Sequence, residues 1–441
     1  MCKYSNSGRK VKPCSLRPIC LSPICVVHSD CMHLLFLAAQ FPYPPRQGGA
    51  LRTWGLISTL ARRHAVSLLA FGDPTEAARS PVRDLFQAME VVPEPAPRTL
   101  PRRLRDLLLT SRPDMALRLE SPVYRQRLGN LLAQDRFDLV LIEGIEMAPF
   151  LETVEGARPR PRVLFDDFNC EYLLQKRAFL TDVRYPWRWH GALYSLVQWR
   201  RLRRYEADIC RRADFVVAVS SADADALRAL VPGRSPLVVP NGVDVSAYDP
   251  RIPPAAGMDE HALVFTGKMD FRPNVDAVLW FAREVLPLVR REVPDAHFWV
   301  VGQRPHPRLA PLRENPAVTL TGYVEDTRPY IAGASVYVAP LRIGGGTRLK
   351  LLEAMAMGRA IVATRLGTEG YEVRDGEELL FADDAASFAR AVVSLLKDPA
   401  RRTALGQAAR RFVEHRYDWS VLAPRIEALL EQRHPLSDKV R

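Results

Sequence analysis

The sequence contains no apolar run long enough to cross a membrane. Its uninterrupted apolar runs, such as residues 34–39, fall far below the ~18 residues that a membrane-spanning helix needs. They have the length of buried strands instead. We therefore expect no transmembrane anchor. A chain of 441 residues is also too long for one ordinary core, so two globular domains are expected.

Cysteine is scarce outside the N-terminal end. Five of the seven cysteines lie in the first 31 residues (Cys2, Cys14, Cys20, Cys25 and Cys31), and the other two are scattered. Their spacing fits neither a disulfide framework nor a zinc site, which indicates a reducing compartment. Pro18 and Pro23 argue against a secretory signal. We expect residues 1–31 to be a disordered tail, and the apolar run after Met32 suggests that translation starts there.

A nucleic-acid-binding motif is also missing, although the net charge is +12 at pH 7. The excess comes mostly from Arg: residues 98–127 hold eight Arg against three acids, and residues 184–212 hold eight against two. No aromatic residues accompany them in a binding pattern, so we expect no nucleic-acid partner. Phosphate-bearing substrates or an anionic membrane fit this charge, and solvated helix faces explain it equally well.

Short apolar or β-branched runs alternate with helical patterns from Met32 onward, which is typical of parallel sheets with crossover helices. A Pro- and Ala-rich stretch at 249–258 is the candidate hinge between two such sets. The sequence thus predicts an α/β fold with two Rossmann-like parallel-sheet domains. The predicted strands are 34–39, 65–71, 139–142, 163–165 and 215–219 before the hinge, and 263–266, 297–301, 318–320, 335–339 and 360–363 after it.

Glycines follow the first predicted strand. Ligands of parallel sheets bind beyond the carboxyl ends of the strands, so the residues there are candidates for chemistry. Gly48 and Gly49 precede a helix that begins near Leu51, and their missing side chains let backbone amides approach an anion. A tight turn explains the pair equally well. No GxGxxG pattern opens either sheet, which disfavours a dinucleotide oxidoreductase.

The strongest signal is the segment IGGGTRLKLLEAMAMG at 343–358. The predicted strand 335–339 leads into Gly344, Gly345 and Gly346, and a helix is predicted from about Thr347. Three consecutive glycines expose backbone amides at a helix N-terminus. This arrangement favours a phosphate group.

Charged side chains follow the three glycines. Arg348 and Lys350 add fixed positive charge next to the predicted phosphate site. Lys350 and Glu353 lie three residues apart on one helix face, so a cation for a phosphate and an acid for a sugar hydroxyl stand side by side. The alternative is a plain surface ion pair between these two residues.

Two weaker candidates follow other predicted strands. In FTGKMDFRPN, at 265–274, Lys268 comes after a strand and a glycine, so its ammonium group is expected to face the same ligand. A solvent-exposed lysine is the alternative. In VVPNGVD, at 238–244, Asn241 belongs foremost to a turn, and a ligand contact is secondary.

As a set, these segments resemble the retaining glycosyltransferases of the GT-B fold, specifically glycosyltransferase family four in its GGGTRLK-type subgroup. The resemblance runs from Met32 to the C-terminus. It rests on FPYPPRQGGALRTWGLISTLARRHAVSLLAF, VVPNGVD, FTGKMDFRPNVDAVLWF, TGYVEDTRPYIAGASVYVAP, GGGTRLKLLEAMAMG and LGTEGYEVRDGEELL, in this order.

The resemblance implies a domain layout. Two Rossmann-like domains face each other across a cleft, with the acceptor domain at 32–250 and the nucleotide-sugar donor domain at 251–413. A C-terminal helix within 414–441 packs back on the acceptor domain. No metal and no cofactor is implied beyond the nucleotide-diphosphate sugar itself.

The resemblance also implies residue roles, from which this sequence departs in places. Glu353 matches the second of two family glutamates seven residues apart, which contacts the nucleotide ribose. The first falls at Gly345, so backbone amides take the place of a carboxylate. A family histidine maps onto Glu143, an acceptor-side candidate, and Glu372 falls near a third family glutamate.

The cations of the family are only partly matched. Lys268 matches the first of two residues that contact the donor phosphates. The second position falls at Pro273 or Asn274, which leaves Arg348 or Lys350 to substitute for it.

The implied reaction is front-face transfer with retention, from the nucleotide sugar to a glycan or lipid-linked acceptor, in cell-surface polysaccharide synthesis. No protein nucleophile is needed, because the leaving diphosphate helps to deprotonate the acceptor hydroxyl. We expect a cytoplasmic protein that is peripheral at the inner face of the membrane. A non-catalytic nucleotide-sugar binding protein and a same-fold epimerase remain alternatives. The catalytic candidates are Lys268, Arg348, Lys350 and Glu353, and the donor-binding candidates are Gly344, Gly345, Gly346, Thr347, Glu372 and Asn241.

Overall fold

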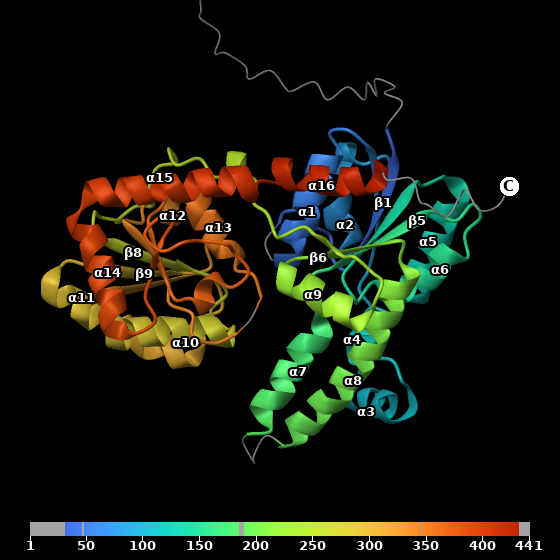
Figure 1. Ribbon diagram of the computed structural model, residues 1–441, viewed down its shortest axis with the longest axis horizontal. Helices are drawn as coiled ribbons and strands as arrows, with labels where there is room; N and C mark the ends of the chain where they lie inside the picture. The colour runs from blue at the N-terminus through green and yellow to red at the C-terminus, as the bar shows by residue number, and fades with distance from the viewer. Residues whose placement is uncertain (1–30, 46–47, 185–188, 345, 432–441) are drawn as a thin grey trace, which may run out of the picture. The chain divides into compact units, whose positions relative to one another are not determined.

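In a computed structural model, the chain forms two parallel sheets (Figure 1). The structure describes residues 31–45, 48–184, 189–344 and 346–431. The first sheet has seven strands in the order β3-β2-β1-β4-β5-β6-β7. All its pairings are parallel, as in β1 against β2, where His33 lies opposite Ala65. Its strands are β1 (His33–Ala38), β2 (Ala65–Phe71), β3 (Met89–Val92), β4 (Leu139–Glu143), β5 (Arg162–Asp167), β6 (Phe215–Ala218) and β7 (Leu237–Val238).

Both faces of the first sheet are covered, which explains why its strands read as continuous apolar runs. Successive residues of β1 point to opposite faces, so that Leu35 and Leu37 join one core cluster while Leu34 and Phe36 join another. The helices of this half are α1 (Gly48–Leu60), α2 (Pro74–Ala78), α3 (Leu100–Leu109), α4 (Asp114–Arg118), α5 (Pro122–Gln134), α6 (Leu151–Glu155), α7 (Glu171–Asp182), α8 (Trp189–Arg212) and α9 (Ser221–Leu230), with short turns η1 (Arg83–Leu85), η2 (Ala148–Phe150) and η4 (Val245–Ala247).

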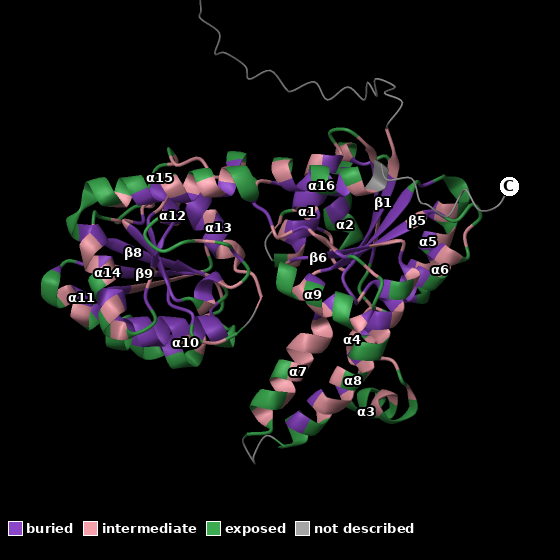
Figure 2. Cartoon of the chain, in the orientation of Figure 1, coloured by how far each residue is buried: buried purple, intermediate pink, exposed green. Residues whose placement is uncertain are grey.

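The second sheet has six parallel strands in the order β10-β9-β8-β11-β12-β13. It is likewise buried on both faces, as the buried strands β8 and β9 in Figure 2 illustrate. Its strands are β8 (Ala262–Thr266), β9 (His297–Val301), β10 (Val318–Gly322), β11 (Val336–Ala339), β12 (Ile361–Ala363) and β13 (Leu380–Phe381). Its helices are α10 (Arg272–Trp280), η5 (Phe281–Val285), α11 (Leu286–Glu292), η6 (Pro307–Glu314), α12 (Arg328–Ala332), α13 (Leu349–Ala356), η7 (Leu366–Thr368) and α14 (Ala385–Lys397).

Two helices close the described chain. Ala409 and Val413 of α15 (Pro399–Arg416) lie in a core cluster of the second sheet, whereas α16 (Trp419–Glu431) places Leu422 in a cluster of the first sheet with α1. The Trp419 indole fills the space where Gly55 of α1 has no side chain, because a Cβ there would lie 2.0 Å from Trp419 Nε1. The last described helix therefore packs on the first helix of the first sheet.

All ten predicted strands are present, and the structure adds three more. β3, β7 and β13 are edge or two-residue strands, too short to stand out as apolar runs. Helix α9 begins after Ser220, whose hydroxyl accepts a hydrogen bond from the Asp223 amide. The helix predicted from Thr347 begins two residues later, at Leu349. The predicted tail at 1–31 lies almost wholly outside the described residues.

The described helices include none that combines the length and the apolar character needed to cross a membrane.

Candidate active site

The turn between β11 and α13 is the centre of the site. Gly344 and Gly346 have φ angles of +104° and +81°, a left-handed region that side chains rarely adopt. Glycine is therefore required by the backbone itself at these two positions. The third predicted glycine, Gly345, lies outside the described residues. Arg348 then takes the N-cap position of α13.

Arg348 is packed against this turn. Its Nε and Nη2 atoms are buried and have no hydrogen-bond partner among the described residues. A Cβ added to Gly344 would lie only 2.9 Å from Nη2. Burial lowers the pKa of Arg348, while the nearby Glu369 carboxylate acts in the opposite direction. A guanidinium group with unsatisfied donors thus lies beside the glycine turn.

Lys350 points toward the neighbouring helix α10. Its Nζ donates a hydrogen bond to Asn274 Oδ1 at 2.8 Å and lies 4.1 Å from the centroid of the Phe265 ring. Gly267, with φ +151°, leaves room for the ammonium group, because a Cβ there would lie 2.6 Å from Nζ. Burial lowers the pKa of Lys350 to about 7, and the positive charge of Arg348 adds to this effect.

The hydrogen-bond partner of Glu353 is Tyr248, not Lys350. Glu353 Oε1 accepts a hydrogen bond of 2.9 Å from the hydroxyl of Tyr248. Burial raises the pKa of Glu353, and this hydrogen bond partly opposes the shift. The alternative interpretation, a surface ion pair between Lys350 and Glu353, is therefore wrong. Each of the two side chains is held from a different segment.

Lys268 lies on the loop that leads from β8 into α10, the helix that carries Asn274. Its side chain is 46% exposed, and its Nζ is 3.7 Å from Asp270 Oδ1. The Asn274 side-chain amide donates to the Lys268 carbonyl oxygen at 2.9 Å. Asn274 thereby connects the Lys268 backbone to the Lys350 ammonium group.

The glycine pair of the first sheet lies close to α13. Gly48 is the first residue of α1, and a Cβ on it would lie 3.6 Å from Leu349 Cδ1, at the first residue of α13. Gly49 packs near Phe168. Two helix N-termini thus lie side by side, and both favour negative charge.

Asn241 links the two halves of the site. Its Nδ2 donates to Thr347 Oγ1 at 2.5 Å, and its Oδ1 accepts from Arg52 Nη1 at 3.3 Å. Arg52 in turn forms a buried two-point ion pair with Asp166, with both distances 2.7 Å. We did not predict Arg52 or Asp166. The available signals were a lone Arg within the apolar stretch of α1 and an acid ending an apolar strand.

Glu143 lies at the end of β4 and is 1% exposed. Its Oε2 accepts a hydrogen bond of 2.9 Å from Thr53 Oγ1, whereas Oε1 has no partner among the described residues. Burial, and next the Asp166 carboxylate, raise the pKa of Glu143 to about 8. Its carboxyl group is therefore held against α1 by Thr53, with one oxygen left without a partner among the described residues.

Glu372 lies apart from the Lys350 network. Its carboxylate is 81% exposed and lies 3.1 Å from Arg416 Nη1. It lines a cavity of about 500 Å³ together with Gly346, Thr347 and Asn169. Three of the predicted donor-binding residues, Glu372, Gly346 and Thr347, therefore line the same cavity.

Comparison with known proteins gives matches for both halves of the chain. Residues 47–247 match the family model described as Glycosyltransferase Family 4, and residues 260–398 match the model described as Glycosyl transferases group 1. A phosphatidyl-myo-inositol mannosyltransferase of Mycolicibacterium smegmatis is 32% identical over 206 residues. This match covers 45% of the chain and 52% of the relative, so the chain spans about half the length of that protein.

Solved structures share the fold at low identity. The sucrose-phosphate synthase of Thermosynechococcus elongatus has a TM-score of 0.66 at 17% identity, covering 91% of this chain and 98% of the other. The Anabaena protein HepE in complex with UDP and glucose has a TM-score of 0.61 at 15% identity, covering 91% and 100%.

The two parallel sheets and the matches to both of them define a protein of the GT-B fold, with two Rossmann-like domains. The chain thus carries a domain that matches the Glycosyltransferase Family 4 model, followed by a domain that matches the Glycosyl transferases group 1 model.

Proposed function

We propose that the chain transfers a sugar, with retention of its anomeric configuration, from a nucleotide-diphosphate sugar to a glycan or lipid-linked acceptor in cell-surface polysaccharide synthesis. The observation that carries this proposal is the environment of Arg348 and Lys350. Arg348 has two buried donor atoms without a partner, and Lys350 donates to a neutral amide rather than to a carboxylate. Buried cations without counter-ions are costly, so both side chains favour a bound anion.

The diphosphate of the donor supplies such an anion. Backbone amides at Gly344 and Gly346, together with the N-terminus of α13, add further donors of positive potential. Lys268, exposed on the neighbouring loop, is free to turn toward the same phosphates. Glu353, oriented by Tyr248, is placed to accept hydrogen bonds from the ribose hydroxyls.

The reaction needs no protein nucleophile and no metal ion at the phosphates. The acceptor hydroxyl oxygen forms a bond to the anomeric carbon while the bond from that carbon to the diphosphate oxygen breaks. The hydroxyl proton passes to the leaving diphosphate oxygen on the same face. Arg348, Lys350 and the glycine-turn amides stabilise the charge that develops there, and removing one such donor costs on the order of 3 kcal/mol.

The relatives support this substrate class. The Mycolicibacterium relative is named for mannosyl transfer to a phosphatidyl-inositol, and the Anabaena structure holds UDP and glucose. The name of the first relative supports a lipid-linked acceptor, and the ligands of the second support a nucleotide-sugar donor.

The test is donor binding and turnover by the full chain. Thermal-shift screening with UDP-, GDP-, ADP- and TDP-sugars identifies the donor, and Arg348→Gln and Lys350→Met should each weaken its binding and turnover about 100-fold. Lys397→Met removes a lysine paired with Glu292 on the surface and serves as the charge-matched control. The anomeric configuration of the product, read by NMR, tests retention.

Three results would contradict the proposal. Donor binding with neither transfer nor slow hydrolysis indicates a nucleotide-sugar binding protein. Isomerisation of the sugar without an acceptor indicates an epimerase. Unchanged donor affinity in both Arg348→Gln and Lys350→Met places the phosphates elsewhere.

We also propose that the protein acts in the cytoplasm as a peripheral protein of an anionic membrane surface, through helix α3. This helix has no buried residue (Figure 2). Leu104 and Leu108 are 52% and 81% exposed. It is held through polar contacts: Arg98 pairs with Asp106 of the helix, and Arg201 of α8 donates to the Leu107 carbonyl oxygen. The apolar face is thus left unpartnered among the described residues.

Charge complementarity favours a membrane as the occupant of this face. Arg102, Arg103 and Arg105 accompany the leucines on an exposed helix, a pattern typical of interfacial helices on anionic lipid. Much of the remaining Arg excess is used internally. Arg118, for example, pairs with Asp114 and Glu146.

Vesicle co-sedimentation tests the membrane proposal. The full chain should bind phosphatidylcholine vesicles that contain phosphatidylglycerol, and the double variant Leu104→Gln/Leu108→Gln should lose most of this binding. Val123→Gln changes an exposed apolar residue on α5 and is the matched control. Binding that is indifferent to phosphatidylglycerol or to the leucine changes would refute the proposal.

A further inference from the structure

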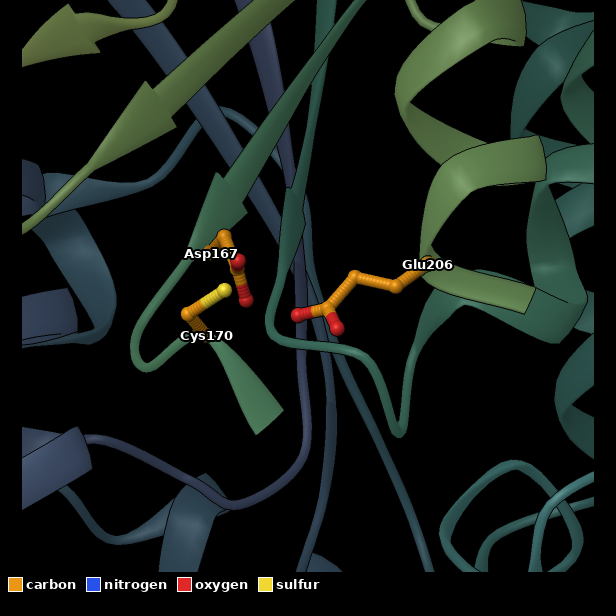
Figure 3. A group of neighbouring side chains, drawn as sticks. All are labelled: Asp167, Cys170 and Glu206. Atoms are coloured by element: carbon orange, nitrogen blue, oxygen red, sulfur yellow. The ribbon is translucent and has the colours of Figure 1, made fainter. Parts of the chain in front are cut away.

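Three buried side chains of types that can bind a metal ion lie close together in the domain of the first sheet (Figure 3). The proposed transfer reaction does not use them. Asp167 ends β5, Cys170 is the N-cap residue of α7, and Glu206 lies on α8. All three are buried, and one ligand atom from each lies within 4.8 Å of the others. Figure 3 shows the Asp167 carboxylate, the Cys170 sulfur and the Glu206 carboxylate turned toward one another.

The environment of Asp167 points to a bound ligand. The Asp167 side chain is 1% exposed, and among the described residues neither of its carboxylate oxygens receives a hydrogen bond from an N–H or hydroxyl donor; its partner is the Glu206 carboxyl group. A buried carboxylate without donors is costly, and a second carboxylate beside it increases the cost. The group therefore needs a cation or a proton at its centre.

Glu206 is already oriented for such a ligand. Its two carboxylate oxygens accept hydrogen bonds from the backbone amides of Glu171 and Tyr172, at 2.9 and 3.0 Å. Each oxygen keeps a further lone pair. Backbone donors that fix a ligating carboxylate are a common feature of metal sites.

We propose that Asp167, Cys170 and Glu206 bind a divalent metal ion, for which zinc is the best fit. Two carboxylates and a thiolate suit zinc better than magnesium or calcium, which prefer oxygen ligands alone. Ligand atoms around a tetrahedral zinc are roughly 3.4 to 3.6 Å apart, so the three side chains need to approach one another by roughly 1 Å. Cys170 also lines the 500 Å³ cavity, which leaves a fourth position open to water.

The ion would fix the segment 167–170 at the cavity wall. Asn169, within this segment, places its Oδ1 3.4 Å from the position of a Cβ on Gly346. The metal site therefore has a positioning role beside the glycine turn. It is separate from the Arg348 and Lys350 side chains that we assign to the phosphates.

The experiment uses the full chain with its five N-terminal cysteines replaced by serine, so that Cys170 and Cys210 are the remaining thiols. Cobalt(II) added to this protein should give a near-ultraviolet sulfur-to-cobalt charge-transfer band, and zinc should displace the cobalt and abolish the band. Cys170→Ser should lose the band, and Asp167→Asn should weaken zinc binding at least tenfold. Cys210→Ser is the matched control and should keep the band.

Two outcomes would overturn the assignment. Absence of the band in the parent protein, with circular dichroism showing it folded, means that a shared proton neutralises the carboxylates. A band that survives Cys170→Ser, or that disappears with Cys210→Ser, places the metal elsewhere. Because the readout is the metal spectrum, failure here leaves the proposed transfer activity untouched.

Discussion

Lys350 Nζ, in the first turn of α13, donates a 2.8 Å hydrogen bond to Asn274 Oδ1, in the first turn of α10. The resemblance to family four implies a phosphate-binding cation at position 273 or 274, where this chain has no charged residue. The structure brings the ammonium group of Lys350 to that place from another helix. This contact is what the proposed substitution of Lys350 for that cation requires.

Donor binding should be accompanied by proton uptake at Lys350. Burial lowers its pKa to about 7 in the free protein, and a bound diphosphate favours the ammonium form and raises the pKa. Above pH 7 the bound state therefore holds more protons than the free state, and affinity falls as pH rises, by up to about tenfold per pH unit. Calorimetry of an intact nucleotide sugar at pH 8, in buffers of different ionisation enthalpy, measures this uptake. The Lys350→Met variant should show none, and equal uptake in both proteins would contradict the prediction.

The substitution Gly267→Ala should displace the Lys350 ammonium group by direct contact. A Cβ at position 267 would lie 2.6 Å from Lys350 Nζ and 2.8 Å from Asn274 Nδ2, so both side chains must shift and their hydrogen bond is disturbed. We expect a loss of donor affinity close to that of Lys350→Met, measured by the same calorimetry. Gly376→Ala is the control, because its φ of +75° imposes backbone strain while no atom lies within 4 Å of the added Cβ. Equal effects of the two substitutions would mean that backbone strain alone is responsible.

Replacing Glu353 should impair the donor step without unfolding the protein. Glu353→Ala removes the proposed ribose contact, and we expect donor turnover to fall at least tenfold. Tyr248→Phe keeps the carboxylate but removes the hydroxyl that orients it, so a smaller loss is expected. Steady-state kinetics with the donor identified by thermal shift measures both variants. Undiminished turnover in Glu353→Ala would rule out the assigned role.

The buried ion pair between Arg52 and Asp166 should dominate the stability of the first sheet. Arg52→Met leaves the Asp166 carboxylate buried without its partner, which costs about 3–5 kcal/mol of unfolding free energy. The double variant Arg52→Met/Asp166→Asn should recover part of this loss. Urea unfolding followed by circular dichroism measures both. Arg251→Met breaks an exposed pair with Asp249 and should leave the unfolding midpoint unchanged.

Local features of the chain were predictable from the sequence. The strands of both sheets are apolar runs because helices cover both faces, and such runs are visible without a structure. The glycine turn was equally visible, since Gly344 and Gly346 adopt backbone angles that other residues avoid. β7 and β13 escaped prediction because two residues do not form a recognisable pattern.

The partners of the charged residues were not predictable. Lys350 and Glu353 share a helix face, so sequence spacing favoured an ion pair between them, yet their contacts come from Asn274 and Tyr248. Arg52 and Asp166 are 114 positions apart, and nothing local to either residue indicates the other.

The sequence by itself determined the two parallel sheets, the glycine turn and the presence of cations beside it, because these follow from backbone sterics and apolar patterning along short stretches. Only the tertiary structure decided which cations are left without a counter-ion and which carboxylates are buried together. Burial and the choice of partner depend on which distant segments pack against each other, and the spacing of residues along the chain does not encode this.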